Sequence, residues 1–295
     1  MDRRHIEKLL LPPLGNGRPI YYKQGDNLKI NKIAKDTTVF YLNVDPQNAD
    51  SKITVNGGSR TSANMSNNNS GLIDIRKLME SSTSKDYKIK IVNNDVDQSI
   101  TSSGIHARAI FGTGKRPFTC WPFLLHKTSS LTITIDDLSG SSNTIRPCFE
   151  AFKYYFDVLG TLPESYKKLL LNSTFFIYTT DDDVSLTSSA TDVVEAFTTM
   201  NDNHDFELRR ITFHSDGDFL VRIATDDGRN DITNGWVHSD SLGGDGEYYS
   251  DLEQGILINR TTKIRYEFKN LSGATNKIYM ALSGVAYFMD VNNDR

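Results

Sequence analysis

One pattern occurs twice in the chain, as Leu131-Thr-Ile-Thr-Ile-Asp-Asp-Leu-Ser-Gly-Ser-Ser-Asn143 and again as Ile264-Arg-Tyr-Glu-Phe-Lys-Asn-Leu-Ser-Gly-Ala-Thr-Asn276. In each copy apolar residues alternate with polar ones, which is the period of a β-strand with one buried face. The alternation is followed by Leu-Ser-Gly and then by Asn, and Gly and Asn are residues that tight turns need. Each stretch therefore predicts a strand that ends in a hairpin turn.

The likeness between the two parts of the chain extends beyond this turn. Asp86-Tyr-Lys-Ile-Lys-Ile91 matches Asp218-Phe-Leu-Val-Arg-Ile223 at a numbering offset of 218 − 86 = 132, and the turn pattern repeats at an offset of 264 − 131 = 133. Further matched positions are Ile100 with Ile232, Thr101 with Thr233, His106 with His238, Gly112 with Gly244, Gly114 with Gly246, and Tyr154 with Tyr287. A match that keeps its order over roughly 70 residues with one gap indicates an internal duplication.

The composition favours strands over helices. The chain has 13 Tyr and 15 Phe, with many Thr, Val and Ile between turns rich in Ser, Asn, Asp and Gly. Such residues suit a pleated, half-buried surface, and many short strands with frequent turns predict a sandwich. We expect an all-β fold of two tandem jelly-roll-like β-sandwich domains, related by internal duplication and joined by a short helical connector.

The duplication sets the predicted boundaries. We expect an N-terminal arm at 1–19, a first domain at 20–156, a connector at 157–174, a second domain at 175–288 and a C-terminal tail at 289–295. The connector contains a predicted helix at Pro163–Leu171. A second short helix is predicted at Leu72–Met79, and the polar stretch Asn56–Gly71 is predicted to be a long loop.

Charge and composition narrow the class of protein. With 33 Lys and Arg against 37 Asp and Glu, the net charge is −4, so we expect no direct sequence-specific binding of nucleic acid. No apolar run approaches the ~20 residues of a membrane-spanning helix. The cluster Leu9–Leu11 ends at two prolines, so we expect no signal peptide. The two cysteines, Cys120 and Cys148, are too few for a disulfide scaffold and favour a reducing compartment.

The sequence holds none of the usual catalytic or metal-binding patterns. Gly-x-Ser-x-Gly, a Walker loop, Cys-x-x-Cys and a zinc-protease His pair are all absent. Acidic clusters such as Asp181–Asp183 and Asp216–Asp218 favour turn chemistry over a bound cation, since none matches the twelve-residue calcium loop. His106 and His238 are equivalent in the duplication, which favours packing or capping roles. We predict no enzyme activity, no catalytic residue, no cofactor and no metal site.

Two sets of residues are candidates for contacts with other molecules. The N-terminal arm mixes basic and apolar side chains, so it is either a frayed terminus or a segment that orders on a neighbouring subunit. The same mixture is compatible with contact with a membrane. Two adjacent tyrosines in the second repeat are expected to be exposed. The predicted interface residues are Ile6, Leu9, Leu10, Leu11, Leu14, Tyr248 and Tyr249.

The pattern of strands and turns also resembles a known class of protein. It stands as Pro122-Phe-Leu-Leu, Leu131–Asn143 and Phe149–Phe156, and again as Gly255-Ile-Leu-Ile, Ile264–Asn276 and Ala281–Phe288. In this pattern the sequence resembles bacteriophage virion structural proteins with tandem jelly-roll domains. Two jelly rolls in one chain are similar to the double-jelly-roll major capsid proteins of some phages. The second copy lacks the proline of Arg116-Pro117-Phe118, so the resemblance is weaker there.

The resemblance implies a function in assembly. We expect a non-enzymatic structural protein of a bacteriophage virion, most simply the capsid shell subunit of double-jelly-roll type. It would self-associate, with a trimer as the expected oligomer, and contact other virion proteins. Its location would be the virion, after assembly in the host cytoplasm. The alternatives are a minor head, neck or decoration protein, or a carbohydrate-binding β-sandwich module with Trp121, Trp236 and tyrosines as its platform.

Overall fold

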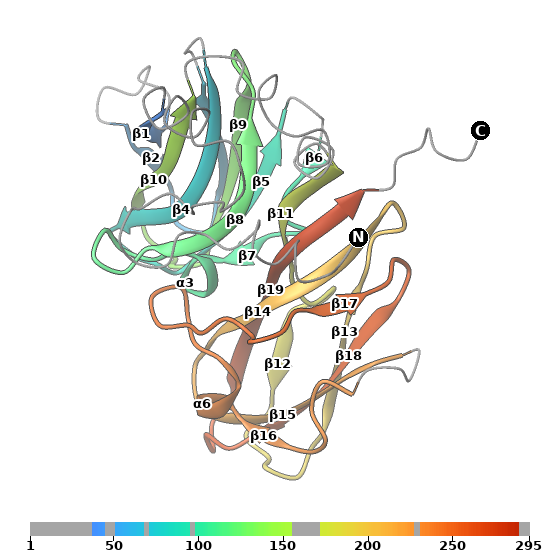
Figure 1. The fold of residues 1–295 in the computed structure, drawn as a ribbon. Coiled ribbons are helices and arrows are strands. Elements are labelled where there is room, and N and C mark those ends of the chain that lie inside the picture. Colours follow the sequence, from blue (N-terminus) through green and yellow to red (C-terminus); the bar gives the residue numbers. More distant parts are fainter. Residues whose placement is uncertain are drawn as a thin grey trace, which may run out of the picture.

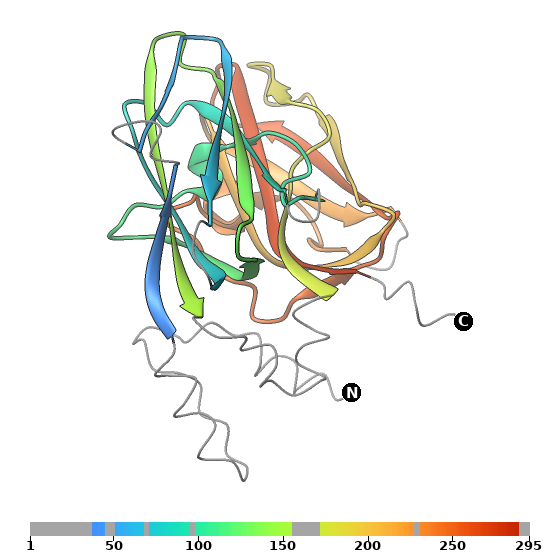
Figure 2. The ribbon, with the colours of Figure 1, turned by 90° about the horizontal axis from the view of Figure 1, so that it is seen from above.

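The computed structural model describes residues 37–44, 51–67, 71–94, 98–154, 172–226 and 231–288. Within them the chain forms two β-sandwiches, each made of two antiparallel sheets (Figure 1). The first sandwich is drawn in blue to green and the second in yellow to red, and Figure 2 shows them side by side from above. None of the described helices is long and apolar enough to cross a membrane.

The first described strand of the first sandwich begins at Thr37. One sheet has the order β1 (Thr37–Asn43), β10 (Asn143–Tyr154), β4 (Leu72–Ser82) and β8 (Phe118–Leu125), and β2 (Ile53–Val55) also pairs with β10. The other has the order β3 (Arg60–Ser66), β9 (Ser130–Asp137), β5 (Tyr87–Asn93) and β6 (Gln98–Ser99), and β7 (Ile105–His106) also pairs with β5. The short helix α3 (Ala107–Ile110) follows β7.

The second sandwich repeats this plan. One sheet has the order β11 (Ser173–Tyr178), β19 (Asn276–Phe288), β14 (His204–Ser215) and β17 (Ile256–Ile258), and β12 (Val184–Leu186) also pairs with β19. The other has the order β13 (Val194–Thr199), β18 (Lys263–Asn270), β15 (Phe219–Thr225) and β16 (Val237–His238). The short helix α6 (Ser239–Leu242) follows β16, as α3 follows β7.

The two sandwiches have the same strand order, which is that of a jelly roll. We count β1 and β2 as one interrupted strand, and likewise β6 and β7. In the second sandwich β11 and β12 are counted as one strand. One sheet then has the order first, eighth, third, sixth, and the other second, seventh, fourth, fifth, in both halves. The predicted fold of two tandem jelly-roll-like sandwiches related by duplication is confirmed.

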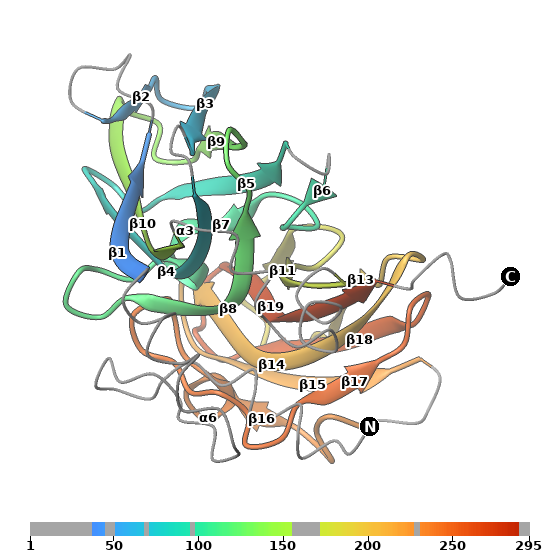
Figure 3. The same ribbon diagram turned by 45° about the horizontal axis from the view of Figure 1, so that its top comes forward.

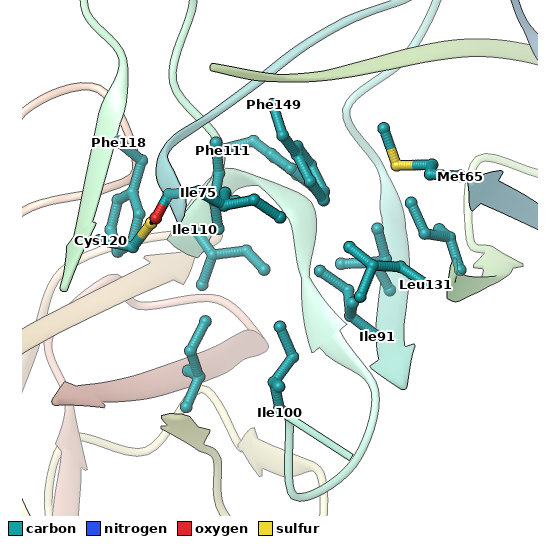
Figure 4. Packing of buried hydrophobic residues seen from close by; sticks show 14 of the residues in the cluster. Met65, Ile75, Ile91, Ile100, Ile110, Phe111, Phe118, Cys120, Leu131 and Phe149 are labelled. Carbon is teal, nitrogen blue, oxygen red and sulfur yellow. The ribbon is translucent and has the colours of Figure 1, made fainter. Parts of the chain in front are cut away.

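Each core lies between the two sheets of its sandwich. The predicted alternation is confirmed in β9, where Leu131, Ile133 and Ile135 are buried and the intervening threonines are only half-buried. The same holds in β18, whose Ile264, Tyr266 and Phe268 are fully buried. Figure 4 shows part of the first core, where β9 and β5 face residues such as Phe149 of β10 and Phe111 after α3.

A β-bulge occurs at equivalent places in the two halves. The register of β4 against both neighbours shifts at Arg76, and that of β14 against β19 shifts at Arg209, which is the equivalent position (209 − 76 = 133). Each bulged arginine binds the carboxylate two positions before it. Arg76 Nε donates to Asp74 Oδ2 at 2.8 Å, and Arg209 Nη2 lies 2.8 Å from Glu207 Oε1. The duplication therefore includes an irregular feature as well as the regular strands.

Two local predictions were wrong. Leu72–Met79 is not a helix but belongs to strand β4, which lies between β10 and β8. The bulge at Arg76 places the buried residues Ile75 and Leu78 three positions apart instead of two, and a spacing of three is also found on one face of a helix. The stretch Asn56–Gly71 is not one loop, because it contains strand β3 after a turn at Gly58.

Several predictions concern residues that the structure does not describe. The arm 1–19, the connector helix Pro163–Leu171 and the tail 289–295 all lie outside the described residues. Strand β11 begins at Ser173, slightly before the expected start of the second domain at Phe175.

Candidate functional site

The two sandwiches contact each other along one face, and we call this contact the seam. It is formed by β7, α3, β8 and the segment Ile100–Ser102 of the first sandwich, against β11, β14 and β19 of the second. Figure 3 shows β8 and β11 between the two sandwiches. Phe175 and Ile177 of β11 are fully buried there and belong to the core of the first sandwich. The two cores thus meet across the seam.

Backbone hydrogen bonds join the sandwiches at the edge of β11. Ile177 N donates to Ile100 O at 2.9 Å, and Ser102 N donates to Ile177 O at 2.9 Å. At the other end of the seam, Gly246 N donates to Arg108 O at 2.7 Å. A Cβ at Gly246 would lie 2.4 Å from Phe111 O, so only glycine fits this close approach. The contact is therefore specific in shape as well as apolar.

A buried arginine lies at the centre of the seam. Arg210 of β14 is 1% exposed, and its Nη1 donates to Thr119 O of β8 at 2.7 Å. Its Nε donates to Asp251 Oδ1 at 2.7 Å, which balances the charge. The guanidinium carbon lies 3.8 Å from the ring centre of Tyr249 and 4.5 Å from that of Phe118. Such cation–π contacts strengthen when water is excluded. Because Phe118 and Thr119 belong to the first sandwich, Arg210 links the two halves.

The two predicted tyrosines differ in exposure. Tyr248 is 62% exposed as expected, with Arg116 of the first half 4.0 Å above its ring. Tyr249 is not the exposed residue that was expected, because the seam covers it. Its hydroxyl accepts from Thr119 N at 2.8 Å and donates to Pro117 O at 3.0 Å. The other predicted interface residues, Ile6, Leu9, Leu10, Leu11 and Leu14, lie outside the described residues.

Three aromatic rings stack at the seam near α3. The ring centre of His106 lies 4.4 Å from that of His214 and 4.6 Å from that of Tyr279. Burial lowers the pKa of His106 to about 4, with a further contribution from His214. Burial also lowers the pKa of His214, and Arg108 adds to that effect. Both histidines are therefore neutral at pH 7.

The equivalent histidines begin equivalent helices, which confirms their predicted capping role. His106 Nδ1 accepts from Arg108 N at 3.3 Å, and His238 Nδ1 accepts from Asp240 N at 3.2 Å. The sequence signal was their equivalence in the repeat. Only His106 also meets rings of the other sandwich, and this could not be seen from the repeat alone.

Salt bridges lie at the rim of the seam. Lys85 Nζ of the first half lies 2.6 Å from Glu247 Oε1 of the second. Lys88 forms a salt bridge with Asp183, and its ammonium lies 5.5 Å from the ring centre of Tyr279. These pairs are partly exposed, so each contributes little to stability, but they fix which side chains meet.

The acidic clusters serve the fold. Asp181 accepts from Thr199 N at 3.0 Å, and Asp226 accepts from Lys263 N at 2.9 Å, so both fasten strand ends. Among the described residues, no three His, Cys, Asp or Glu side chains gather as a metal site requires. Cys120 is buried and Cys148 half-buried, and burial raises the pKa of both thiols. Neither thiol is activated as a nucleophile.

A polar depression of about 390 Å³ lies at one end of the seam, lined by residues of both halves. Its hydroxyl groups already bond within the chain. Thr101 Oγ1 accepts from Ile91 N at 3.2 Å, and Ser102 Oγ accepts from Thr179 N at 3.1 Å. Thr199 Oγ1 donates to Asp181 Oδ2 at 2.7 Å, and Asp181 also accepts from Thr199 N, so this pair holds the end of β13. The lining groups named here therefore hold the backbone together.

The tryptophans do not form a common platform. Trp121 is 4% exposed and packs against Phe175 in the seam, at 6.0 Å between ring centres. Trp236 is 37% exposed, with Lys269 Nζ 4.4 Å from its ring centre. A flat face for sugar stacking needs exposed rings, and one of the two predicted rings is buried.

Comparisons with known proteins give little further information. No family model matches the chain, and no curated protein matches it. The tandem CBM22-1-CBM22-2 domain of Paenibacillus barcinonensis Xyn10C has 6% identity and a TM-score of 0.18, with 85% of this chain and 91% of that chain covered. The VP2 subviral particle of infectious bursal disease virus has 7% identity and a TM-score of 0.20, with 95% and 46% covered. Pumpkin pro-11S globulin has 7% identity and a TM-score of 0.17, with 84% and 85% covered. Likenesses at TM-scores this low carry no weight for function.

Proposed function

We propose that the chain is a non-enzymatic structural protein of a bacteriophage virion, most simply a shell subunit of double-jelly-roll type. The observation that carries the proposal is the seam, which joins two duplicated jelly rolls into one unit. Buried arginine, stacked rings and backbone hydrogen bonds hold that contact together. A shell subunit needs its domains held in a fixed relative orientation, because neighbouring copies must meet in fixed geometry.

The use of polar side chains supports this proposal. In the described residues, Asp181 and Asp226 fasten strand ends, and His106 and His238 cap helices. An active site would instead leave reactive groups converging on an accessible cavity. The function therefore lies in the outer surfaces of this unit.

The location and partners follow from this role. The protein would belong to the virion after assembly in the host cytoplasm. It would associate with itself, with a trimer as the expected oligomer, and would contact other virion proteins. A minor head, neck or decoration protein is the alternative within the same class. Copy number in purified particles separates these roles, since a shell subunit is present in far more copies than a neck protein.

A carbohydrate-binding module is the alternative from another class. The burial of Trp121 removes one of the two rings that it would need. Trp236 remains half-exposed, so a glycan screen with the native chain and the W236A variant tests what is left of this alternative. Glycan binding that W236A abolishes would favour it.

The test of the proposed function is the assembly state of the purified full chain. Sedimentation velocity and electron microscopy over a wide range of concentration should show defined oligomers, rings or particles. A chain that stays monomeric at every concentration, alone and with other virion proteins, would contradict the proposal.

A further inference from the structure

Strands β1 and β11 occupy the same place in their sandwiches. Each is an edge strand beside the last strand of its half, and each pairs with it in the same register. Phe152 of β10 and Val285 of β19 are equivalent in the duplication (285 − 152 = 133), and they pair with corresponding residues of the edge strands. The equivalent residues are thus Val39 and Phe175, and likewise Tyr41 and Ile177.

The equivalent side chains differ completely in burial. Phe175 and Ile177 are 0% exposed, because the seam covers them. Val39 is 55% exposed and Tyr41 is 53% exposed, and both rank among the large apolar side chains that face solvent. The first sandwich thus presents the surface that the second sandwich uses in the seam, and no described part of the chain covers it.

The opposite side of the seam is also present twice. In the first sandwich the segment Ile100–Ser102 binds the edge of β11. Its equivalent in the second sandwich is 232–234, held in the same way by the neighbouring strand. Ile100 N donates to Ile91 O at 3.0 Å, and Ile232 N donates to Ile223 O at 3.1 Å. The second sandwich therefore holds a preformed copy of the segment that docks on an edge strand.

This second copy is open where the first is covered. Ile105 and His106 of β7 are buried in the seam, whereas their equivalents Val237 and His238 of β16 are only half-buried. The side chain of His238 is 38% exposed against 0% for that of His106. The chain thus carries both sides of the seam contact again, on opposite sandwiches, and both are open within the described residues.

Charges on the two free surfaces are complementary. At the position of Arg108 the second sandwich has Asp240, whose side chain is 83% exposed (240 − 108 = 132). At the position of Tyr279 the first sandwich has Arg146, which is exposed (279 − 146 = 133). In the seam His106, whose ring nitrogen caps Arg108 N, stacks on Tyr279. A repeat of the contact would therefore bring Asp240 close to Arg146.

We propose that the Val39–Tyr41 face of β1 binds a second copy of this chain, through the 232–240 edge of that copy's second sandwich. The contact repeats the seam between molecules, and rests on the proposed function in assembly. Because the two surfaces differ, the contact joins copies head to tail. Such a chain of copies closes into a ring when a whole number of the rotations between neighbouring copies makes a full turn. No described strand pairs with the outer edge of β1. That edge would form the backbone bonds that β11 forms with Ile100 O, which accepts, and with Ser102 N, which donates.

The first test places a charge on the exposed face. Y41D and V39D, in the full chain, should weaken association at least about 30-fold, since a buried charge removes a central interface contact. The melting temperature of V39D should stay near the native value, because the side chain of Val39 is exposed in one copy. Y41D also removes the hydrogen bond of Tyr41 to Glu150, so V39D separates loss of association from loss of stability. F197D is the matched control, since Phe197 is 39% exposed on β13, which lies at the opposite edge of its sheet from β16. It should assemble like the native chain.

The second test reverses the charges. R146D and D240R should each weaken association, and the double variant R146D/D240R should restore it, which no merely structural role would do. Sedimentation velocity measures all variants.

The outcomes separate this inference from the proposed function. If the native chain assembles and Y41D assembles equally well, another surface such as the N-terminal arm joins the copies, and the inference is overturned while the function stands. If the double charge reversal fails to restore assembly that both single variants lose, the predicted pairing is wrong. A native chain that never assembles overturns both.

Discussion

Acid should weaken the seam because it holds neutral histidines. His106 Nδ1 accepts a hydrogen bond from Arg108 N, so its Nε2 carries the proton and faces Asp86 Oδ1 at 3.3 Å. A second proton on Nδ1 would break the helix cap and place a charge against His214 and near Arg108. His204 is a second such group, buried between Tyr178 and Asn203 within the second sandwich.

The size of the effect follows from the pKa values. Burial lowers the pKa of both His106 and His204 from 6.5 to about 4. Between these values the unfolded chain binds a proton that the folded chain does not, so stability is complete above pH 6.5 and falls as the pH drops towards 4. At about 1.4 kcal/mol for each pH unit, the loss is about 3 kcal/mol for each histidine. Two such losses are comparable with the whole stability of many domains.

Urea unfolding as a function of pH measures this loss. Burial raises the pKa of Asp74 and Glu80, and these acids act in the opposite direction, since the folded chain binds their protons more tightly. The histidine contribution is therefore isolated by comparing the native chain with H106N, in which Asn keeps a cap acceptor that does not titrate. H106N should lose about half of the acid sensitivity that the histidines cause.

The matched control is H238N, which alters the equivalent cap of α6 outside the seam. H238N should leave unchanged the loss of free energy of unfolding that His106 causes in acid. If H106N and the native chain lose the same free energy of unfolding between pH 7 and 4, the stacked rings are not held neutral by burial and the reasoning fails.

Three further perturbations test the fold and the seam. R210A should lower the free energy of unfolding by about 3 kcal/mol, because it leaves Thr119 O without its buried partner; a loss below about 1 kcal/mol in urea would show that the seam does not depend on this cation. N143A and N276A should each cost about 2 kcal/mol, since each buried amide both donates to and accepts from the backbone of an equivalent turn, at Ser84 and at Gly217; unequal melting temperatures for the two variants would argue against equivalent roles. G140A and G273A should each cost about 1 kcal/mol, because both glycines have φ near +70°; calorimetry showing no loss in either would mean that the turns relax.

Local patterns in the sequence account for much of the fold. The alternation of Leu131, Ile133 and Ile135 places one face in the core, whatever the rest of the chain does. The turn at Gly140 follows from backbone sterics within a few residues. His106 and His238 cap their helices through contacts two positions away. Interactions of such short range are readable from the sequence, and the duplication doubles the signal.

The seam could not be read in this way. The bulge at Arg76 reverses the buried side of β4 in mid-strand, and the pattern then imitated a helix. Tyr249 and Trp121 look like surface aromatics in sequence, yet each is covered by residues of the other sandwich, far away along the chain.

The clearest case is the pair of edge strands. Val39 and Tyr41 have the same place and register as Phe175 and Ile177. The sequence alone determined that all four residues are apolar. Only the tertiary structure decided which face is covered. The physical reason is that burial of a strand's outer face depends on whether a segment distant in the sequence docks on it. Within the described residues, such a segment docks on β11 and none docks on β1.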